Sequence, residues 1–303
     1  MIDSKNIDFI KKIKERASRS LKIEEIYLNT KSYSETIKYL QKQKYLEFDS
    51  INKLLNNIFS TDHPIGYVIK NEKKAIVGFM GTIYSKRNFN NREYTYCNIH
   101  SWVVEEAYRI NSFLLLTPLI SQEITLTAFT PVKSLIGLLE KFDFKKVKMK
   151  YRIILLFNFP ISKKSDYFIE KNSIEIKKRI NKSDLKVYES YYSLPYEKFL
   201  IINKKDNSKY FLVIASRVKK KGLSVLNLFY TSNTAAFKNN WNQFKNIISK
   251  EFKINFCSQY FFQDDYGALP NNVFLSKTKE KHICVKNLPP NINIDTLYSD
   301  LIE

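Results

Sequence analysis

The chain has 303 residues, a length that suits two domains of about 150 residues each. Its six glycines never complete the GxGxxG or GxxxxGK spacing, which excludes a Rossmann dinucleotide site and a P-loop. Hydrophobic residues make up 44% of the chain, with no apolar run near the ~18 residues of a membrane-spanning helix. The charged N-terminus does not resemble a signal peptide, and the three scattered cysteines form no disulfide framework. We therefore expect a cytoplasmic protein with no membrane span.

The formal net charge is +20, but the kind of basic residue matters. Of the 50 basic residues, 42 are lysine and eight are arginine. Specific readout of guanine and bidentate contact with phosphate both favour arginine. The lysines are spread along the chain, and the densest runs are Lys145–Lys150 and Lys219–Lys221. The charge neither predicts nor excludes a nucleic-acid partner.

The first half predicts a mixed α+β domain over residues 1–160. Helices are expected at Ile7–Ser18, Ser34–Tyr45 and Ser50–Phe59, the last two each beginning at a serine suited to N-capping. The expected strands are Leu21–Leu28, Gly66–Ile69, Ala75–Tyr84, Tyr94–Val104, Ile124–Phe129 and Lys146–Phe157. Two further helices, Ser112–Ile120 and Pro131–Lys141, separate the last three strands. A polar loop is expected between residues 87 and 92, and residues 161–172 are predicted to be a linker.

The second half, residues 173–303, repeats this order more faintly. The expected elements are a helix at Ser183–Tyr192, strands at Phe199–Asn203, Tyr210–Val218 and Leu223–Tyr230, a long helix at Thr234–Lys250, a strand at Ile254–Phe262 and a short helix at Ile294–Ile302. A strand hairpin, a third strand, a helix and a final strand recur in the same order. We therefore expect two tandem α+β domains, each with a mixed, mostly antiparallel sheet flanked by helices.

Three segments suggest a family. They read AIVGFMG from Ala75, HSWVVEEAYRINSFLLL from His100, and LLEKFDF from Leu138. In order and spacing they resemble the central hairpin, the fourth strand with its turn into the cofactor-binding helix, and the segment after the fifth strand in the GNAT superfamily of acyl-CoA N-acyltransferases. The first half carries the better match, and the second resembles a degenerate copy.

The resemblance implies a binding site for acetyl-CoA or another acyl-CoA as co-substrate. Trp102, Val103 and Val104 would face the pantetheine arm. The pyrophosphate would lie at a turn formed by Arg109, Ile110, Asn111, Ser112, Phe113 and Leu114, where a helix N-terminus favours an anion. The sequence departs from the family pattern at four positions. Ser112 and Leu114 replace small residues, Leu139 stands where a tyrosine is frequent, and Asp143 replaces a glycine.

His100 and Glu105 are the candidate catalytic bases, since acyl transfer to an amine requires removal of a proton. His100 lies two residues before Trp102, so both side chains are expected on one face of the strand. A histidine bonded within the sheet and a solvated helix-entry carboxylate are the alternatives. Tyr94 and Tyr96 either line a substrate groove or pack against a helix.

A second polar cluster follows a strand of the second half. Asp264 and Asp265 either contact the substrate or are simply solvated. The histidines and cysteines show no metal-ligand spacing, so no metal is implied.

Three functions remain open. The first is N-acyltransfer, most simply of acetyl, to an amine on a small molecule or sugar by direct attack on the thioester. The second is a catalytically inactive GNAT-fold binding or scaffold protein. The third is a tandem protein that binds an anionic polymer or aminoacyl-tRNA, whose affinity would fall steeply with salt.

Overall fold

The computed structural model describes residues 21–28, 30–43, 55, 62–89, 92–129, 131–156, 165–220, 222–262, 269 and 278–289. The predicted helices at Ile7–Ser18 and Ile294–Ile302, and nearly all of that at Ser50–Phe59, lie outside these residues. Asp264 and Asp265 lie outside them as well.

The described residues fall into two compact units. The first contains the residues up to Val147 and those from His282 onward, and the second contains Lys148–Lys281. The expected linker at residues 161–172 includes strand β7 (Tyr167–Glu170), and strand β12 (Thr278–Lys286) contributes to the first unit. The strands hydrogen-bond in the order β1-β2-β3-β4-β5-β12-β6-β11-β10-β9-β8-β7. Where we expected one sheet for each domain, the pairing therefore runs through all twelve described strands.

The first unit follows the predicted order of elements closely. In chain order these are β1 (Lys22–Ile26), α2 (Lys31–Gln41), β2 (Gly66–Lys70), β3 (Ile76–Phe89), β4 (Arg92–Val104), η1 (Glu106–Leu116), α4 (Thr117–Ile120), β5 (Thr125–Ala128) and α5 (Lys133–Glu140). Strand β6 (Lys145–Leu155) follows; it starts in the first unit and continues into the second. All six predicted strands are confirmed. The expected polar loop is wrong, because β3 and β4 pair as far as Phe89 and Arg92.

Helix α2 starts earlier than predicted. The side chain of Thr30 accepts a hydrogen bond from the amide of Tyr33, so Thr30 is the N-cap instead of Ser34. Tyr39 and Leu40, near the end of this helix, pack with Ile26, Val68 and Phe79 on one face of the antiparallel strands.

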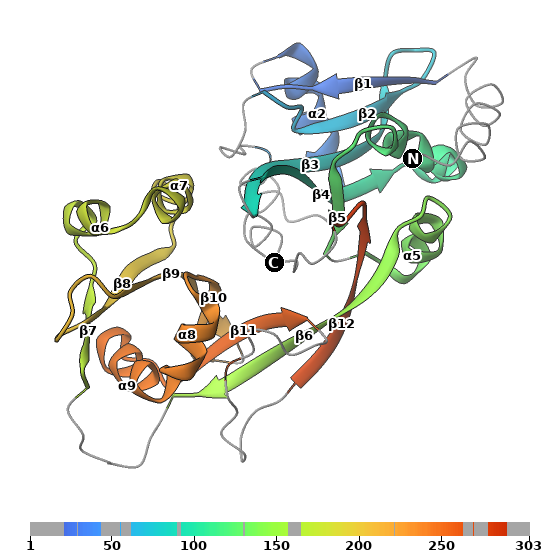
Figure 1. Cartoon of the computed structure of the whole chain (residues 1–303). Helices are drawn as coiled ribbons and strands as arrows, with labels where there is room; N and C mark the ends of the chain where they lie inside the picture. The colour runs from blue at the N-terminus through green and yellow to red at the C-terminus, as the bar shows by residue number, and fades with distance from the viewer. Residues whose placement is uncertain are drawn as a thin grey trace. The chain divides into compact units, whose positions relative to one another are not determined.

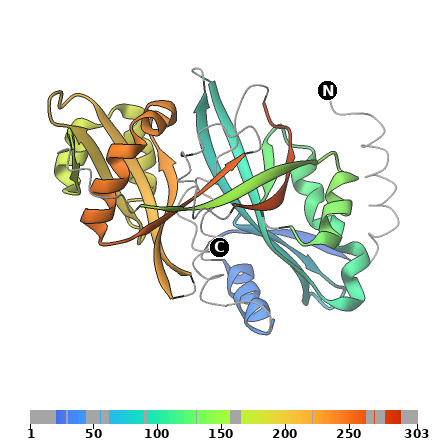
Figure 2. The same cartoon turned by 90° about the horizontal axis from the view of Figure 1, so that it is seen from below.

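The opposite face of these strands is covered by η1, α4 and α5. Leu115, Leu119 and Leu139 from the helices pack there against Met80 and Cys97 of the strands. Figure 2 shows α2 in blue and the green helices on different sides of the strands of this unit. The unit is thus a sheet between two helical layers.

The second unit has the same succession of pairings. Its elements are β7, α6 (Ser173–Arg179), α7 (Lys182–Ser190), β8 (Glu197–Asn203), β9 (Tyr210–Lys220), β10 (Leu223–Thr231), α8 (Thr234–Asn239), α9 (Trp241–Phe252) and β11 (Phe256–Phe262). Strands β8, β9 and β10 form an antiparallel meander, and β10 pairs in parallel with β11 after the helices. The first unit does the same with β2, β3 and β4, followed by the parallel pair β4–β5.

Four elements of the second unit were not predicted as observed, and strand β12 was not predicted either. Strand β7 and helix α6 were missed, and the predicted long helix is divided at Asn240 into α8 and α9. Helices α6 and α7 cover one face of β8–β10, where Ile176 and Tyr188 pack on Leu200 and Leu212. Helices α8 and α9 cover the other face (Figure 1).

Within the part of the chain that the structure describes, no helix combines the length and apolar character needed to cross a membrane.

Candidate functional site

Strands β4 and β5 run side by side over only part of their length. Their parallel pairing joins Tyr96, Cys97 and Asn98 to residues 125–127, and Thr127 donates its hydroxyl hydrogen to Asn98 Oδ1 at 3.2 Å. Beyond Asn98, residues 99–104 of β4 have no partner in β5. Among the residues that the structure describes, the pairing of β4 with β5 therefore ends at Asn98.

A β-bulge interrupts β4 in this same stretch. Gly81 pairs with His100 and Phe79 with Val103, so Ser101 and Trp102 together oppose the single residue Met80. Ser101 has a φ of 47°, in the left-handed region that residues with a β-carbon rarely adopt. The bulge shifts every later side chain of β4 to the other face of the sheet.

The prediction that His100 and Trp102 share a face is therefore wrong. Trp102 packs on the face covered by η1 and α5. The His100 ring lies above Gly81, on the side of Phe79 and α2. The cause is the extra residue at Ser101, which no alternation of apolar and polar residues reveals.

His100 is enclosed by the sheet. Its exposed fraction is 5%, and burial lowers the pKa of the imidazole from 6.5 to about 3. Nδ1 lies 3.0 Å from the hydroxyl oxygen of Ser101, and Nε2 has no partner among the described residues. The ring is neutral at physiological pH, but it is a weak base with little access to solvent.

Two more buried side-chain nitrogens on β4 lack a hydrogen-bond partner among the described residues. They are Nδ2 of Asn98 and Nε1 of Trp102. A buried donor without an acceptor costs roughly 1–3 kcal/mol, so an acceptor supplied by a ligand would be favourable. Val103 and Val104, the other predicted pantetheine residues, bury their side chains on opposite faces and can contribute only backbone groups.

The predicted phosphate turn has a different local structure from the one expected. Residues Glu106–Leu116 form a 3-10 helix whose N-cap is Glu105, so Arg109 and Ser112 lie inside the helix and not at its start. Amides inside a 3-10 helix donate to the carbonyl three residues earlier. The first amides of η1 lie beside the carboxylates of Glu105 and Glu106, which oppose an anion. The prediction that a helix begins at Ser112 is therefore wrong, because the helix already begins at Glu106.

Side chains of this helix divide into exposed and buried sets. Arg109 is exposed and lies 3.9 Å from Glu106, while Ile110 is 83% exposed. Asn111, Ser112 and Phe113 are half-buried, and the side chain of Leu114 is buried in the core. Phosphate contact from this segment would therefore come from the side chains of Arg109, Asn111 and Ser112.

The other predicted site residues of this region, Glu105, Tyr94 and Tyr96, lie toward the two ends of β4. Glu105 is exposed at its C-terminal end, and its backbone N–H donates to the carbonyl of Val77 at 2.9 Å. Near the other end, Tyr94 and Tyr96 share a face with His100 because the register has no shift between them. Tyr96 is buried and Tyr94 is half-buried.

After α5, Asp143 stands where the family pattern has a glycine. Its backbone conformation shows why an aspartate can take that place. Asp143 has a φ of 64°, the left-handed conformation that glycine adopts freely and aspartate tolerates. Its carboxylate lies 3.4 Å from the ammonium of Lys286. Leu139, at the position of the frequent tyrosine, is fully buried in the core.

Sequence reasoning missed Gly81 and Ser101, which build the bulge, and a buried carboxylate in the second unit, Asp184. The one available signal for Asp184 was an asparagine three residues earlier, typical of a helix N-cap. Among the described residues no three histidine, cysteine or acidic side chains are grouped to hold a metal ion.

The chain was compared with known proteins by sequence and by structure, and only the structural comparison finds similar proteins. No protein-family model matches the chain, and no curated protein matches its sequence. Among solved structures, a GCN5-related N-acetyltransferase from Anabaena variabilis has a TM-score of 0.58 at 11% identity, covering 88% of this chain and 72% of its own.

Two other structures are similar to the chain to nearly the same degree. A probable N-acyltransferase from Enterococcus faecalis has a TM-score of 0.56 at 12% identity, covering 88% of this chain and 71% of its own. A GCN5-related N-acetyltransferase from Kribbella flavida has a TM-score of 0.55 at 9% identity, covering 88% and 70%. With its antiparallel meander, its short parallel pair β4–β5 and its helical layers, the chain has the fold of the GCN5-related N-acetyltransferases.

Proposed function

We propose that the chain is an acyl-CoA-dependent N-acyltransferase, with acetyl-CoA or another acyl-CoA as co-substrate and an amine on a small molecule or sugar as acceptor. The observation that supports this most is the unpaired edge of β4 beyond Asn98, beside the bulge at Ser101. The pantetheine arm carries two amide groups, which would pair with backbone amides of residues 102–104. We also propose that the two units are tandem copies of this fold, since their strands pair in the same succession.

In this proposal Glu105 is the general base. It is exposed, it directly follows the unpaired edge of β4, and a carboxylate can remove the amine proton through one water. His100 is less suited to this role because its ring is buried and its pKa is about 3. We assign His100 the positioning of the bulge, through its contact with Ser101 and its place above Gly81.

Titration calorimetry with acetyl-CoA tests the binding step. The native chain should bind acetyl-CoA, and Ser112→Asp should weaken binding about tenfold or more, because a carboxylate would face the phosphates. The matched control is Ser224→Asp, which adds the same charge at an exposed position of β10. No binding of acetyl-CoA at millimolar concentration would contradict the proposal.

Release of free CoA in the presence of an amine panel tests the catalytic step. Glu105→Gln should lower turnover about 100-fold while leaving acetyl-CoA binding unchanged, since general-base catalysis typically contributes ~10²–10⁴-fold. Glu106→Gln, the neighbouring exposed carboxylate, is the control and should retain activity.

A second candidate function is a GNAT-fold protein that binds a ligand without acyl transfer. It is favoured by Leu139, which is buried in the core at the position where the family frequently has a tyrosine that protonates the leaving thiolate. Acetyl-CoA binding without release of CoA for any amine, in the native chain and in Glu105→Gln alike, would support this function over catalysis.

A further inference from the structure

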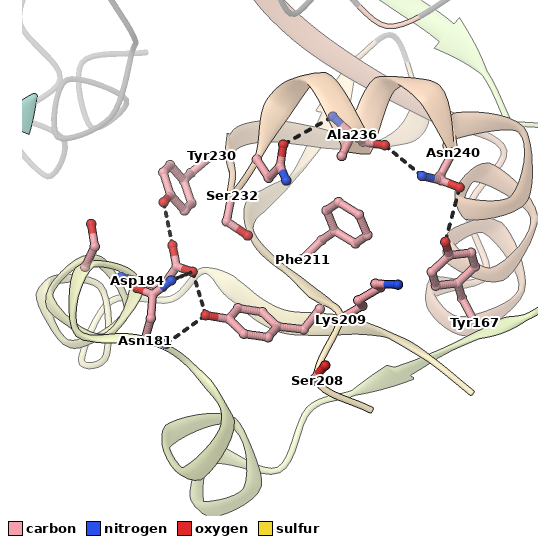
Figure 3. Close-up of a pocket in the computed structure, with 13 residues that line it drawn as sticks. Tyr167, Asn181, Asp184, Ser208, Lys209, Phe211, Tyr230, Ser232, Ala236 and Asn240 are labelled. Carbon is pink, nitrogen blue, oxygen red and sulfur yellow. Dashed lines mark hydrogen bonds between the residues drawn. The ribbon is translucent and has the colours of Figure 1, made fainter. Parts of the chain in front are cut away.

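The second unit contains a cavity of about 570 Å³ (Figure 3). It lies where β9 begins and β10 ends, beside the first turns of α7 and α8. Its volume falls within the roughly 300–1,000 Å³ typical of small-molecule sites. Aromatic rings of Tyr167, Phe211 and Tyr230 form part of its wall, together with the carboxylate of Asp184. Nothing in the proposed acyl transfer uses this cavity.

The start of α7 fixes Asp184 in place. Asn181 caps the helix, and its Oδ1 accepts a hydrogen bond from the backbone N–H of Asp184 at 2.8 Å. The side-chain amide of Asn181 donates to Asp184 Oδ2 at 3.2 Å. The carboxylate therefore has a defined direction, and only 4% of the residue is exposed.

Two tyrosines from neighbouring strands donate to the same carboxylate. The hydroxyl of Tyr210 on β9 lies 3.0 Å from Oδ2, and that of Tyr230 on β10 lies 2.8 Å from Oδ1. Figure 3 shows the hydroxyl of Tyr230 directed at Asp184. All three side chains that donate to Asp184 are neutral, and no described lysine, arginine or histidine forms an ion pair with it.

A buried carboxylate of this kind is costly unless a positive charge accompanies it. Its two oxygens offer about four acceptor positions, and three side-chain donors leave room for one more. Lys209 also lines the cavity, but its side chain is 73% exposed and its ammonium pairs with Asp206 at 3.2 Å. The buried charge of the cavity is thus negative, and the faces of its aromatic rings also favour a cation.

We propose that this cavity binds a small organic molecule through a primary ammonium group, which pairs with Asp184. The aromatic walls contact the body of the ligand, and the side chains of Asn240 and Ser232 offer further polar groups. An anionic ligand, such as the phosphates of a CoA, is disfavoured here by the same carboxylate. The site is independent of acyl-CoA binding in the first unit.

The first test uses the native chain and a matched pair of probes, benzylamine and benzyl alcohol. They share an aromatic ring and differ in the ammonium group. Ligand-detected NMR titration should show benzylamine binding about tenfold more tightly, the scale of one hydrogen bond between charged groups. Equal binding of the two compounds, or no binding of benzylamine at millimolar concentration, would overturn the proposal. Displacement of benzylamine by CoA would also overturn it.

Variants then locate the binding. Asp184→Asn keeps the shape of the side chain and should weaken benzylamine binding about tenfold, with little change for benzyl alcohol. The control is Glu189→Gln, which removes the same charge from an exposed position of α7 and should leave binding unchanged. Ala236→Leu fills the cavity without touching Asp184 and should weaken binding of both probes. Full benzylamine affinity in folded Asp184→Asn or Ala236→Leu would refute this site.

Discussion

The imidazole ring of His100 occupies the space in which a β-carbon of residue 81 would lie. A β-carbon built on Gly81 would be 2.5 Å from Nε2 and 2.7 Å from Nδ1 of His100, closer than such atoms approach in proteins. The two residues are directly paired in β3 and β4, immediately before the bulge at Ser101. A glycine on one strand is therefore what allows a buried histidine on the next.

The first prediction concerns this pair. Gly81→Ala should lower the free energy of unfolding by about 1–3 kcal/mol, because the added methyl overpacks a site that the His100 ring already fills. In the background His100→Ala the same substitution should cost much less, since the space is then vacant. Chemical denaturation of the four proteins in this cycle measures the coupling, and additive effects would contradict the contact.

Gly137→Ala is the matched control for that experiment. Gly137 lies within α5, and a β-carbon there would have no neighbour within 4 Å. Alanine in a helix interior is about 0.5–1 kcal/mol more favourable than glycine. This variant should therefore be more stable than the native chain, which distinguishes local overpacking at Gly81 from a general intolerance of alanine.

The second prediction is a loss of stability in mild acid. The pKa of His100 is lowered by burial to about 3 in the folded chain, against an ordinary value of 6.5. Between these two values the unfolded chain binds a proton that the folded chain does not, so the free energy of unfolding falls as the pH falls. The slope for this one group approaches about 1.4 kcal/mol per pH unit.

Denaturation of the native chain and of His100→Gln at pH 7 and pH 5 isolates this contribution. The stability difference between the two proteins should shrink by roughly 2 kcal/mol over this interval. Glu24, whose pKa is lowered by its hydrogen bond from Lys70, stays below its ordinary value of 4.5 and contributes only at lower pH. Parallel pH profiles for the two proteins would show that His100 is not buried as a neutral ring.

The third prediction concerns the polar network around Asp184. Tyr210→Phe removes a donor to the carboxylate and leaves the backbone N–H of Asn181 without its acceptor, which is 2.7 Å away. We expect a loss of about 1–3 kcal/mol in the free energy of unfolding. Tyr192→Phe, at an exposed tyrosine just after α7, is the control and should change stability by less than about 0.5 kcal/mol.

Much of the fold could be predicted from the sequence because long strands with apolar alternation dominate it. Strands β4 and β9 are long and rich in apolar and aromatic residues, and the predicted bounds of each differ from the observed ones by two residues at one end only. Strand β7 has only four half-buried residues beside a polar stretch, so no periodic signal marks it. Helices α8 and α9 were merged because their division at Asn240 uses a residue compatible with a helix interior.

The candidate site was harder to predict because it depends on departures from regular structure. The bulge at Ser101 moves Trp102 to the face opposite His100. A prediction from alternation assumes a strand without an inserted residue, so it cannot detect this change. The start of η1 at Glu106 places Arg109 and Ser112 within the helix, whereas serine is a common N-cap and suggested a later start. Asp184 meets Tyr210 and Tyr230 only through tertiary packing, so their separation in sequence gives no indication of a network.

The last prediction uses the two tryptophans, whose indole N–H groups are both buried without an acceptor in the described part of the chain. Trp102→Phe should weaken acetyl-CoA binding about tenfold if the indole donates to the pantetheine arm, the scale of one buried hydrogen bond. Trp241→Phe makes the same change in the core of the second unit, where Trp241 is 1% exposed, and should leave acetyl-CoA affinity unchanged. Both substitutions remove packing contacts, so both variants should have a lower melting temperature in thermal unfolding. Calorimetric titration of each folded variant separates that cost from binding, and equal affinities would exclude a contact between Trp102 and the cofactor.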